Sequence, residues 1–233
     1  MKVIAAEFVT SVAPASSAAG IPRDGLLQVA MVGRSNVGKS TLINALLRRP
    51  MARTSAAAGK TRLVNIFRIT VEGGRPGRWS LYLVDLPGYG YARGGAVSAE
   101  ELKAVAEAYF RGSGLGARDS GRSTEKSETA PRDPSPETRL VTLLIDSRHP
   151  GLESDLQAHN WLATLGAEPL VVATKIDKLS RAERARNLRE LERIFGKPAL
   201  PVSAERGEGM DELWKTIAKL ARGAERRTRA VDG

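Results

Sequence analysis

The segment Gly33–Ser40 constrains this chain more than any other feature, because it reads GRSNVGKS and matches the pattern G-x-x-x-x-G-K-[ST]. The apolar run Leu26–Gly33 leads into it and predicts a buried strand, and a helix is expected over Lys39–Leu47. Glycines in such a turn let successive backbone N–H groups point at a phosphate, and the helix N-terminus adds partial positive charge. The segment predicts a phosphate-binding loop; the alternative is a glycine turn that binds nothing.

Two side chains of this loop have expected chemical roles. Lys39 is expected to bridge the β- and γ-phosphates of a nucleotide and so to take part in catalysis, and Ser40 is expected to coordinate Mg²⁺. The nucleotide contacts expected from the whole loop are Gly33, Arg34, Ser35, Asn36, Val37, Gly38, Lys39, Ser40 and Thr41.

The segment TKID, Thr174–Asp177, predicts which base the nucleotide carries, since a phosphate loop alone does not separate ATP from GTP. It leaves the end of the predicted strand Pro169–Thr174, the edge where ligands bind in sheets of this class. Asp177 can accept hydrogen bonds from the ring N–H and the exocyclic amine of guanine, whereas adenine would leave the carboxylate unpaired, a difference of about 10⁴ or more. Lys175 is expected to lay its alkyl stem over the base, and Thr174 to fix the loop. The remaining base contacts are expected from Ile176 and, in the segment VSAERGEG, from Val202, Ser203 and Ala204, with backbone N–H groups directed at guanine O6.

The segment DLPG, Asp85–Gly88, follows a further predicted strand, Trp79–Asp85. Asp85 is expected to face Mg²⁺ through a water molecule, and the Gly88 N–H is expected to meet the γ-phosphate, which makes Gly88 a catalytic candidate. Leu86 and Pro87 are included among the nucleotide contacts.

The small-residue stretch Thr54–Leu63 lies between these motifs and suits a mobile switch. Thr61 is the predicted second Mg²⁺ ligand and a catalytic candidate, with Thr54 as the competing choice. Either threonine could instead cap a turn. The nucleotide contacts expected from this stretch are Gly59, Lys60, Thr61, Arg62 and Leu63.

The order of the predicted elements favours an α/β fold. Arg62–Val71 and Trp79–Asp85 flank a Gly/Pro turn and predict a hairpin, and later strands alternate with helices, which implies right-handed βαβ crossovers. We expect the three-layer sandwich of a P-loop NTPase, with a mostly parallel six-stranded sheet, one antiparallel edge strand and helices on both faces. The later strands are expected at Leu140–Asp146, Pro169–Thr174 and Ala199–Val202, and the helices at Ser98–Phe110, Glu153–Leu165, Ser180–Phe195 and Met210–Ala221.

The predicted organisation is one nucleotide-binding domain with appendages. Residues 1–25 are assigned to an N-terminal arm and residues 26–222 to the domain. Residues 112–139 have almost no apolar side chains and are interpreted as a disordered insertion. Residues 223–233 are assigned to a basic flexible tail, interpreted either as a solvated end or as an arm that touches nucleic acid.

The amino-acid composition indicates the cellular compartment and the kind of partner to expect. The 233 residues include no cysteine, which favours a reducing cytoplasm, and the apolar runs are far shorter than a membrane span requires, so no membrane partner is expected. A formal charge of +10 suggests a large anionic partner, and aromatic residues at 5% favour a structured phosphate backbone over stacked single strands.

With these motifs in order, the chain resembles the EngB family, also called YihA or YsxC, among the TrmE-Era-EngA-like P-loop GTPases. The resemblance depends on DLPGYGYA at Asp85–Ala92, LIDSRHP at Leu144–Pro150, FVTSVA near Phe8, the P-loop and TKID. One departure is the switch sequence AAGKT, where the family tends to have TPGRT, and the other is the long insertion.

The resemblance implies a bacterial GTPase needed for assembly of the large ribosomal subunit, described through effects on cell division and septation. GTP and GDP are the implied ligands, Mg²⁺ the cofactor, the large subunit or its precursor the partner, and a monomer the expected state. Tyr89 stands where Ras-like switches place a glutamine, so slow intrinsic hydrolysis is expected, with stimulation by K⁺ near Asn36 or by the ribosomal particle. Asn36 could instead only brace the loop. An RNA-binding scaffold and a small-metabolite kinase are the competing functions.

Overall fold

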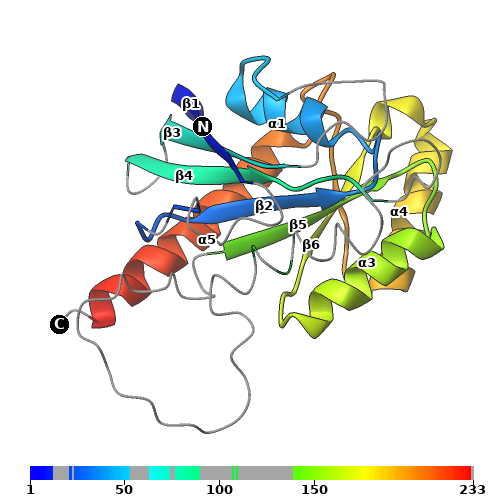
Figure 1. Cartoon of the computed structure of the whole chain (residues 1–233). Helices are drawn as coiled ribbons and strands as arrows, with labels where there is room; N and C mark the ends of the chain where they lie inside the picture. Colours follow the sequence, from blue (N-terminus) through cyan, green and yellow to red (C-terminus); the bar gives the residue numbers. More distant parts are fainter. Residues whose placement is uncertain are drawn as a thin grey trace, which may run out of the picture.

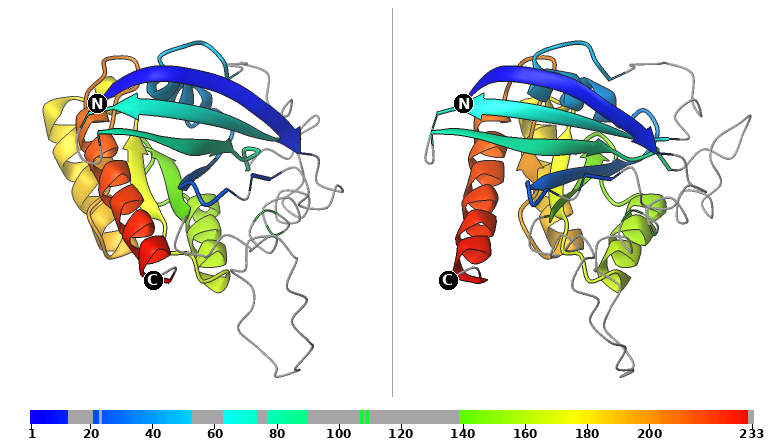
Figure 2. Two further views of the ribbon diagram at one scale, coloured as in Figure 1. Left: turned by 90° about the vertical axis from the view of Figure 1, so that its left-hand side faces the viewer. Right: turned by 60° about the vertical axis from the view of Figure 1, so that its left-hand side comes forward.

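The computed structural model describes residues 1–12, 21–22, 24–52, 63–73, 77–89, 107, 109 and 139–231, the last ten of these by their backbone. A seven-stranded sheet forms the centre (Figures 1 and 2), in the order β1-β3-β4-β2-β5-β6-β7. The strands are β1 Lys2–Val12, β2 Gln28–Gly33, β3 Val64–Glu72, β4 Arg78–Asp85, β5 Arg139–Asp146, β6 Leu170–Thr174 and β7 Leu200–Pro201.

Among the described strands, β3 alone runs against the others. It pairs antiparallel with β1 and with β4, whereas β2 pairs parallel with β4 and β5, β5 with β6, and β6 with β7. Every residue of β2 is buried, and so is every residue of β5 after Arg139, as expected for parallel strands covered on both faces. The carboxyl ends of β2, β4, β5 and β6 therefore meet at one edge.

Helices cover both faces of the sheet (Figure 2). One core contains apolar side chains of α1 (Lys39–Leu47) and α5 (Met210–Val231) on one face. The other contains those of α3 (Glu153–Thr164) and α4 (Arg181–Phe195). The predicted α/β sandwich is confirmed by this arrangement. Across the described residues, no helix combines the length and the apolar character needed to cross a membrane.

The structure differs from the sequence-based expectations in the number of strands and in three boundaries. The predicted arm contains β1, which makes seven strands instead of six and places the antiparallel strand one position inside the edge. β1 escaped prediction because its side chains are mostly exposed, so apolar and polar residues do not alternate clearly.

The other two corrections concern the ends of the expected insertion and tail. Arg139 is the first residue of β5 and not the last of an insertion. Helix α5 continues to Val231, ten residues past its expected end, so residues 223–231 are helical; alanine, glutamate and arginine in this stretch favour helix. Of the helix expected over Ser98–Phe110, Glu107 and Tyr109 alone are described, both helical, and residues 112–138 lie outside the described part of the chain.

Candidate nucleotide-binding site

The predicted phosphate loop connects β2 to α1 at the carboxyl edge of the sheet. Gly38 has φ 100° and forms the N-cap of α1, a left-handed conformation that glycine adopts without steric cost. Asn36 also has positive φ, 64°. Because Gly38 ends the loop without a side-chain cap, the first N–H groups of α1 are left for a ligand, which fits an anion at this helix end.

The lysine of the loop is held by the acidic residue at the end of β4. The buried Lys39 ammonium contacts Asp85 Oδ1, and Asp85 is itself 3% exposed. β2 and β4 are parallel neighbours with Met31 opposite Asp85, so their ends coincide. The two motifs, 46 residues apart, thus meet beside the first turn of α1.

The DLPG segment lies directly on the phosphate loop. The Ser35 N–H donates to the Tyr89 carbonyl (2.8 Å), and the Tyr89 N–H donates to the Gly33 carbonyl (3.3 Å). A Cβ atom on Gly88 would lie 3.0 Å from the Ser35 nitrogen, so a larger residue here would force the Ser35 backbone to shift by a few tenths of an ångström. The predicted γ-phosphate sensor is therefore adjacent to the predicted phosphate cradle.

Tyr89 extends from this contact into a buried polar cluster that the sequence did not reveal. Its hydroxyl donates to Asp155 Oδ1 (3.0 Å) of α3, and the same oxygen lies 3.4 Å from Nε of Arg34. Burial raises the pKa of Tyr89, and burial also raises the pKa of Asp155, against the opposing effects of Tyr89 and Arg34. The cluster connects both phosphate-site motifs to α3.

The TKID segment reaches the same edge from β6. The Thr174 hydroxyl donates to the Val37 carbonyl (2.7 Å), which joins β6 to the phosphate loop. Asp177 accepts a hydrogen bond from the Ser203 hydroxyl (2.7 Å), and its side chain is 4% exposed. Burial raises the pKa of Asp177, but Ser203 and Lys178 outweigh this effect and leave the pKa below its usual value, so the residue is an anion at neutral pH.

A small cavity lies between these segments. Its lining combines the phosphate loop and the start of α1, the TKID segment, and the segment after β7. The lining residues are Gly38, Thr41, Leu42, Thr174, Lys175, Asp177, Val202, Ala204 and Glu205. Seven of the nine are residues predicted to contact the nucleotide, and Leu42 and Glu205 are the additions.

Several of the predicted site residues lie outside the part of the chain that the structure describes. Gly59, Lys60, Thr61 and Arg62, and the alternative Thr54, lie outside the described residues, whereas Leu63 is described and 39% exposed. The second Mg²⁺ ligand thus stays a prediction. Among the described residues, no three His, Cys, Asp or Glu side chains gather as a metal cluster. The Ser40 hydroxyl is an oxygen group of the kind that Mg²⁺ prefers, and Asp85 stays the carboxylate expected to face the metal through water.

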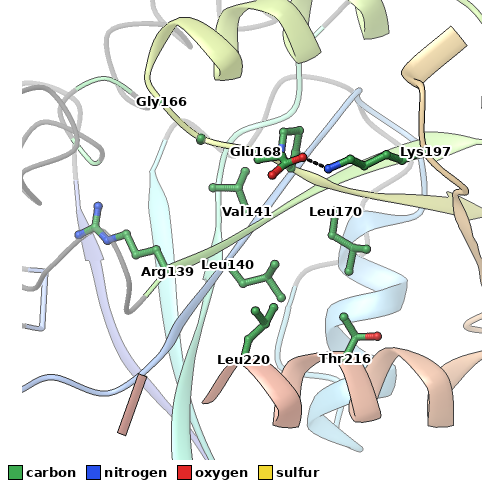
Figure 3. A pocket seen from close by; sticks show the side chains of 11 residues that line it. Arg139, Leu140, Val141, Gly166, Glu168, Leu170, Lys197, Thr216 and Leu220 are labelled. Atoms are coloured by element: carbon green, nitrogen blue, oxygen red, sulfur yellow. Dashed lines mark ion pairs between the residues drawn. The ribbon is translucent and has the colours of Figure 1, made fainter. Parts of the chain in front are cut away.

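A second hollow lies at the opposite edge, where β5 and β6 begin (Figure 3). Leu140, Val141, Leu170 and Leu220 give it an apolar lining, and Glu168 and Lys197 form an ion pair beside it. None of the predicted site residues lines this hollow.

Comparison with known proteins agrees with this geometry. Residues 28–175 match the family model described as 50S ribosome-binding GTPase, which is more than half of the chain. The protein is therefore a P-loop GTPase.

Relatives define the family more narrowly. A probable GTP-binding protein EngB of Pelotomaculum thermopropionicum is 36% identical, with 94% of this chain and 96% of the relative covered. A probable GTP-binding protein EngB of Solibacter usitatus is 38% identical, with 93% of this chain and 96% of the relative covered. The chain belongs to the EngB family of GTP-binding proteins.

Solved structures share the fold. The crystal structure of a probable GTP-binding protein EngB has a TM-score of 0.53 at 20% identity and covers 84% of this chain and 99% of its own. The structure of Era in complex with MgGDPNP and nucleotides 1506–1542 of 16S ribosomal RNA has a TM-score of 0.55 at 26% identity and covers 84% of this chain and 56% of its own.

Proposed function

We propose that this GTPase is a Mg²⁺-dependent switch in assembly of the large ribosomal subunit, with the effects on cell division and septation that such a role implies. The convergence of three motifs at one sheet edge carries the proposal, since Lys39–Asp85, Ser35–Tyr89 and Thr174–Val37 join segments distant in sequence. The formal charge of +10 favours ribosomal RNA as the partner. The Era complex, a related fold bound to MgGDPNP and 16S ribosomal RNA, supports ribosomal RNA as the class of partner. Such a role is cytoplasmic, and we propose a monomer.

Each part of the site has a proposed role in this switch. The Gly33–Thr41 loop binds the phosphates, with Lys39 on the β- and γ-oxygens. Ser40 and Thr61 would hold Mg²⁺, and Asp85 would face the metal through water. Bound Mg²⁺ neutralises charge that develops between the β- and γ-phosphates. Gly88 senses the γ-phosphate by its N–H and, with Tyr89 pinned to the loop, reports its loss.

We propose slow intrinsic hydrolysis, because Tyr89 has no amide with which to orient water and its hydroxyl is directed to Asp155. A positive group supplied from outside accelerates this reaction by about 10³ to 10⁵. The ribosomal particle and a K⁺ ion near Asn36 are the two proposed sources. Equal turnover in KCl and NaCl would exclude K⁺ and leave Asn36 as a brace of the loop.

The base-reading role of Asp177 is tested by Asp177→Asn. The Asn amide can donate to the additional carbonyl of xanthine, but it can accept only one of the two hydrogen bonds that guanine donates, so the binding preference should change from GDP to xanthosine diphosphate. Competition binding of the two nucleotides measures the change. Retained GDP preference would assign base reading to another segment.

The switch role is tested by the affinity of purified large-subunit precursor for the protein loaded with GDP or with a non-hydrolysable GTP analogue. A switch requires different affinities in the two states, because a ligand with equal affinity for both states shifts nothing. Equal affinities would instead support the alternative, an RNA-binding scaffold in which the nucleotide only orders the fold. The +10 charge is the observation that keeps this alternative open.

A further inference from the structure

The turn after β5 carries the segment DSRHP, Asp146–Pro150, to which the nucleotide-binding roles above assign nothing. Asp146 is the last residue of β5, and its side chain is 4% exposed. The turn is fixed on two sides, since the Ser147 N–H donates to the Thr174 carbonyl (3.0 Å) and Asn187 of α4 donates to the Ser147 carbonyl (2.9 Å). A rigid turn therefore presents Asp146 beside the start of TKID.

Both oxygens of Asp146 are occupied by protein donors. Oδ1 accepts from the backbone N–H (3.1 Å) and Nε (2.9 Å) of Arg148, and Oδ2 accepts from Arg148 Nη2 (2.7 Å) and Lys175 Nζ (3.0 Å). The two-pronged grip of Arg148 orients the carboxylate plane. The carboxylate is thus oriented toward Lys175.

Lys175 is held at both ends. Its backbone has φ 58°, a left-handed conformation that costs energy in a residue with a side chain. Its ammonium donates to the Asn36 carbonyl of the phosphate loop (2.5 Å) as well as to Asp146. Between these points the alkyl stem crosses the loop, with Cε 3.6 Å from where a Cβ on Gly38 would lie, and it lines the small cavity.

We propose that Asp146 and Arg148 are positioning residues for guanine binding: Asp146 holds the Lys175 ammonium on the Asn36 carbonyl, so that the lysine stem forms one wall of the base pocket. Arg148 fixes Asp146 in the orientation that this requires. The inference rests on the proposed role of TKID in base recognition. It gives the DSRHP segment a function in the affinity of the nucleotide, whereas Asp177 determines which base is bound.

The proposal predicts a pattern that a merely structural role does not produce. Asp146→Asn keeps the shape but removes the charge, so GDP should bind about tenfold to a hundredfold more weakly. The affinity of Asp146→Asn for inosine diphosphate and for xanthosine diphosphate should fall by a similar factor, each compared with that of the wild-type protein. The reason is that the Lys175 stem is expected to contact the face of the ring and not its exocyclic groups. Glu168→Gln, which removes the charge of an exposed carboxylate paired with Lys197 at the opposite edge, is the matched control and should leave affinity unchanged.

A double-mutant cycle on GDP affinity tests whether Asp146 acts through Lys175. Lys175→Met keeps an apolar stem and removes the ammonium, so adding Asp146→Asn to it should cost less than twofold. If the loss of GDP affinity in the double variant equals the product of the losses in the two single variants, Asp146 acts independently of Lys175 and the proposal is overturned. Arg148→Lys should retain more GDP affinity than Arg148→Ala, since a single ammonium replaces part of the forked contact, and equal losses would exclude Arg148 from the arrangement.

Two further readouts separate the possible failures. Unfolding temperatures of all variants should be measured beside the affinities, and Arg148→Ala, which alters a 41% exposed side chain, gives a second test if Asp146→Asn does not fold. If Asp177→Asn switches base preference while Asp146→Asn binds GDP normally, the inference fails and the base-reading role stands. If Asp177→Asn leaves base preference unchanged, the proposed role of TKID fails whatever Asp146 does.

Discussion

At the scale of single residues, buried ionisable groups next to the phosphate loop decide how firmly the site is built. Tyr89 donates a hydrogen bond to the fully buried Asp155, and Arg34 forms an ion pair with the same carboxylate. We expect Tyr89→Phe to lower the free energy of unfolding by about 1–3 kcal/mol, because it removes a donor from a buried carboxylate. Urea unfolding measures the loss.

Tyr82→Phe is the matched control for this substitution. The Tyr82 hydroxyl donates to Asp24 (2.7 Å). Because Asp24 is exposed, water can replace the donor that the substitution removes. The expected cost is about 1 kcal/mol or less. Equal losses in the two variants would contradict a special role for the buried cluster.

Acid sensitivity is a second consequence at the residue scale. Burial raises the pKa of Asp146, but the hydrogen bonds from Arg148 and Lys175 outweigh it and lower the pKa to about 2 from an ordinary 3.8. A depressed pKa in the folded state adds stability that is complete above the unfolded value and is lost as the pH falls through about 2. This contribution is at most about 2 kcal/mol.

Asp146→Asn removes that titration. We expect the free energy of unfolding of the wild-type protein to fall more steeply than that of the variant between about pH 5 and pH 2, so that the two curves converge in acid. Urea unfolding at a series of pH values measures both curves. Parallel curves would show that the ion pairs of Asp146 do not stabilise the fold.

At the scale of elements, α4 begins with a capping box. This helix carries Asn187, whose side chain holds the turn at Ser147. The Ser180 hydroxyl accepts from the Glu183 N–H (3.3 Å), and the Glu183 carboxylate accepts from the Ser180 N–H (2.9 Å). Ser180→Ala should lower the free energy of unfolding by about 1 kcal/mol, whereas Ser180→Asp keeps an acceptor and should cost little. Chemical denaturation of the two variants provides the comparison, and equal stability would argue against the cap.

Sequence patterns predicted those elements whose residues share one environment. β2 and β5 read as apolar runs because both faces are covered, and α1 was predicted with its observed bounds because the glycine turn marks its start. β1 was missed because an edge strand with one partner carries exposed side chains, and its pairing with β3 depends on residues about 60 positions away. Local patterns do not contain that information.

The site shows the same division. The phosphate loop, DLPG and TKID were predicted from the residue types that their chemistry requires. The contacts that orient them were not, because Asp146 meets Lys175 and Tyr89 meets Asp155 only after β5, β6 and α3 are packed together. Each of these pairs joins a predicted segment to one that carried no assigned role.

At the scale of the whole molecule, the C-terminal end of helix α5 and the nucleotide site lie at different ends of the sheet. Helix α5 runs from the segment after β7 back to the edge where β5 and β6 begin, since Thr216 and Leu220 line the hollow there (Figure 3). Its last turns extend past the sheet (Figure 1), and residues 222–231 include four arginines and one glutamate. The proposed contact with ribosomal RNA can therefore be tested at this end without altering the residues of the nucleotide site.

Replacing the four arginines Arg222, Arg226, Arg227 and Arg229 with glutamine tests this separation. Glutamine preserves helix propensity, so the substitution changes charge and not the helix. Each lost phosphate contact lowers the slope of log affinity against log salt concentration by about 0.7 to 0.9, and a fall of about 1 to 3 is expected for large ribosomal subunits. GDP affinity should not change, because the substituted turns lie at the far edge. An unchanged salt slope would place the ribosomal contact elsewhere, and weaker GDP binding would show that the two ends are coupled through α5.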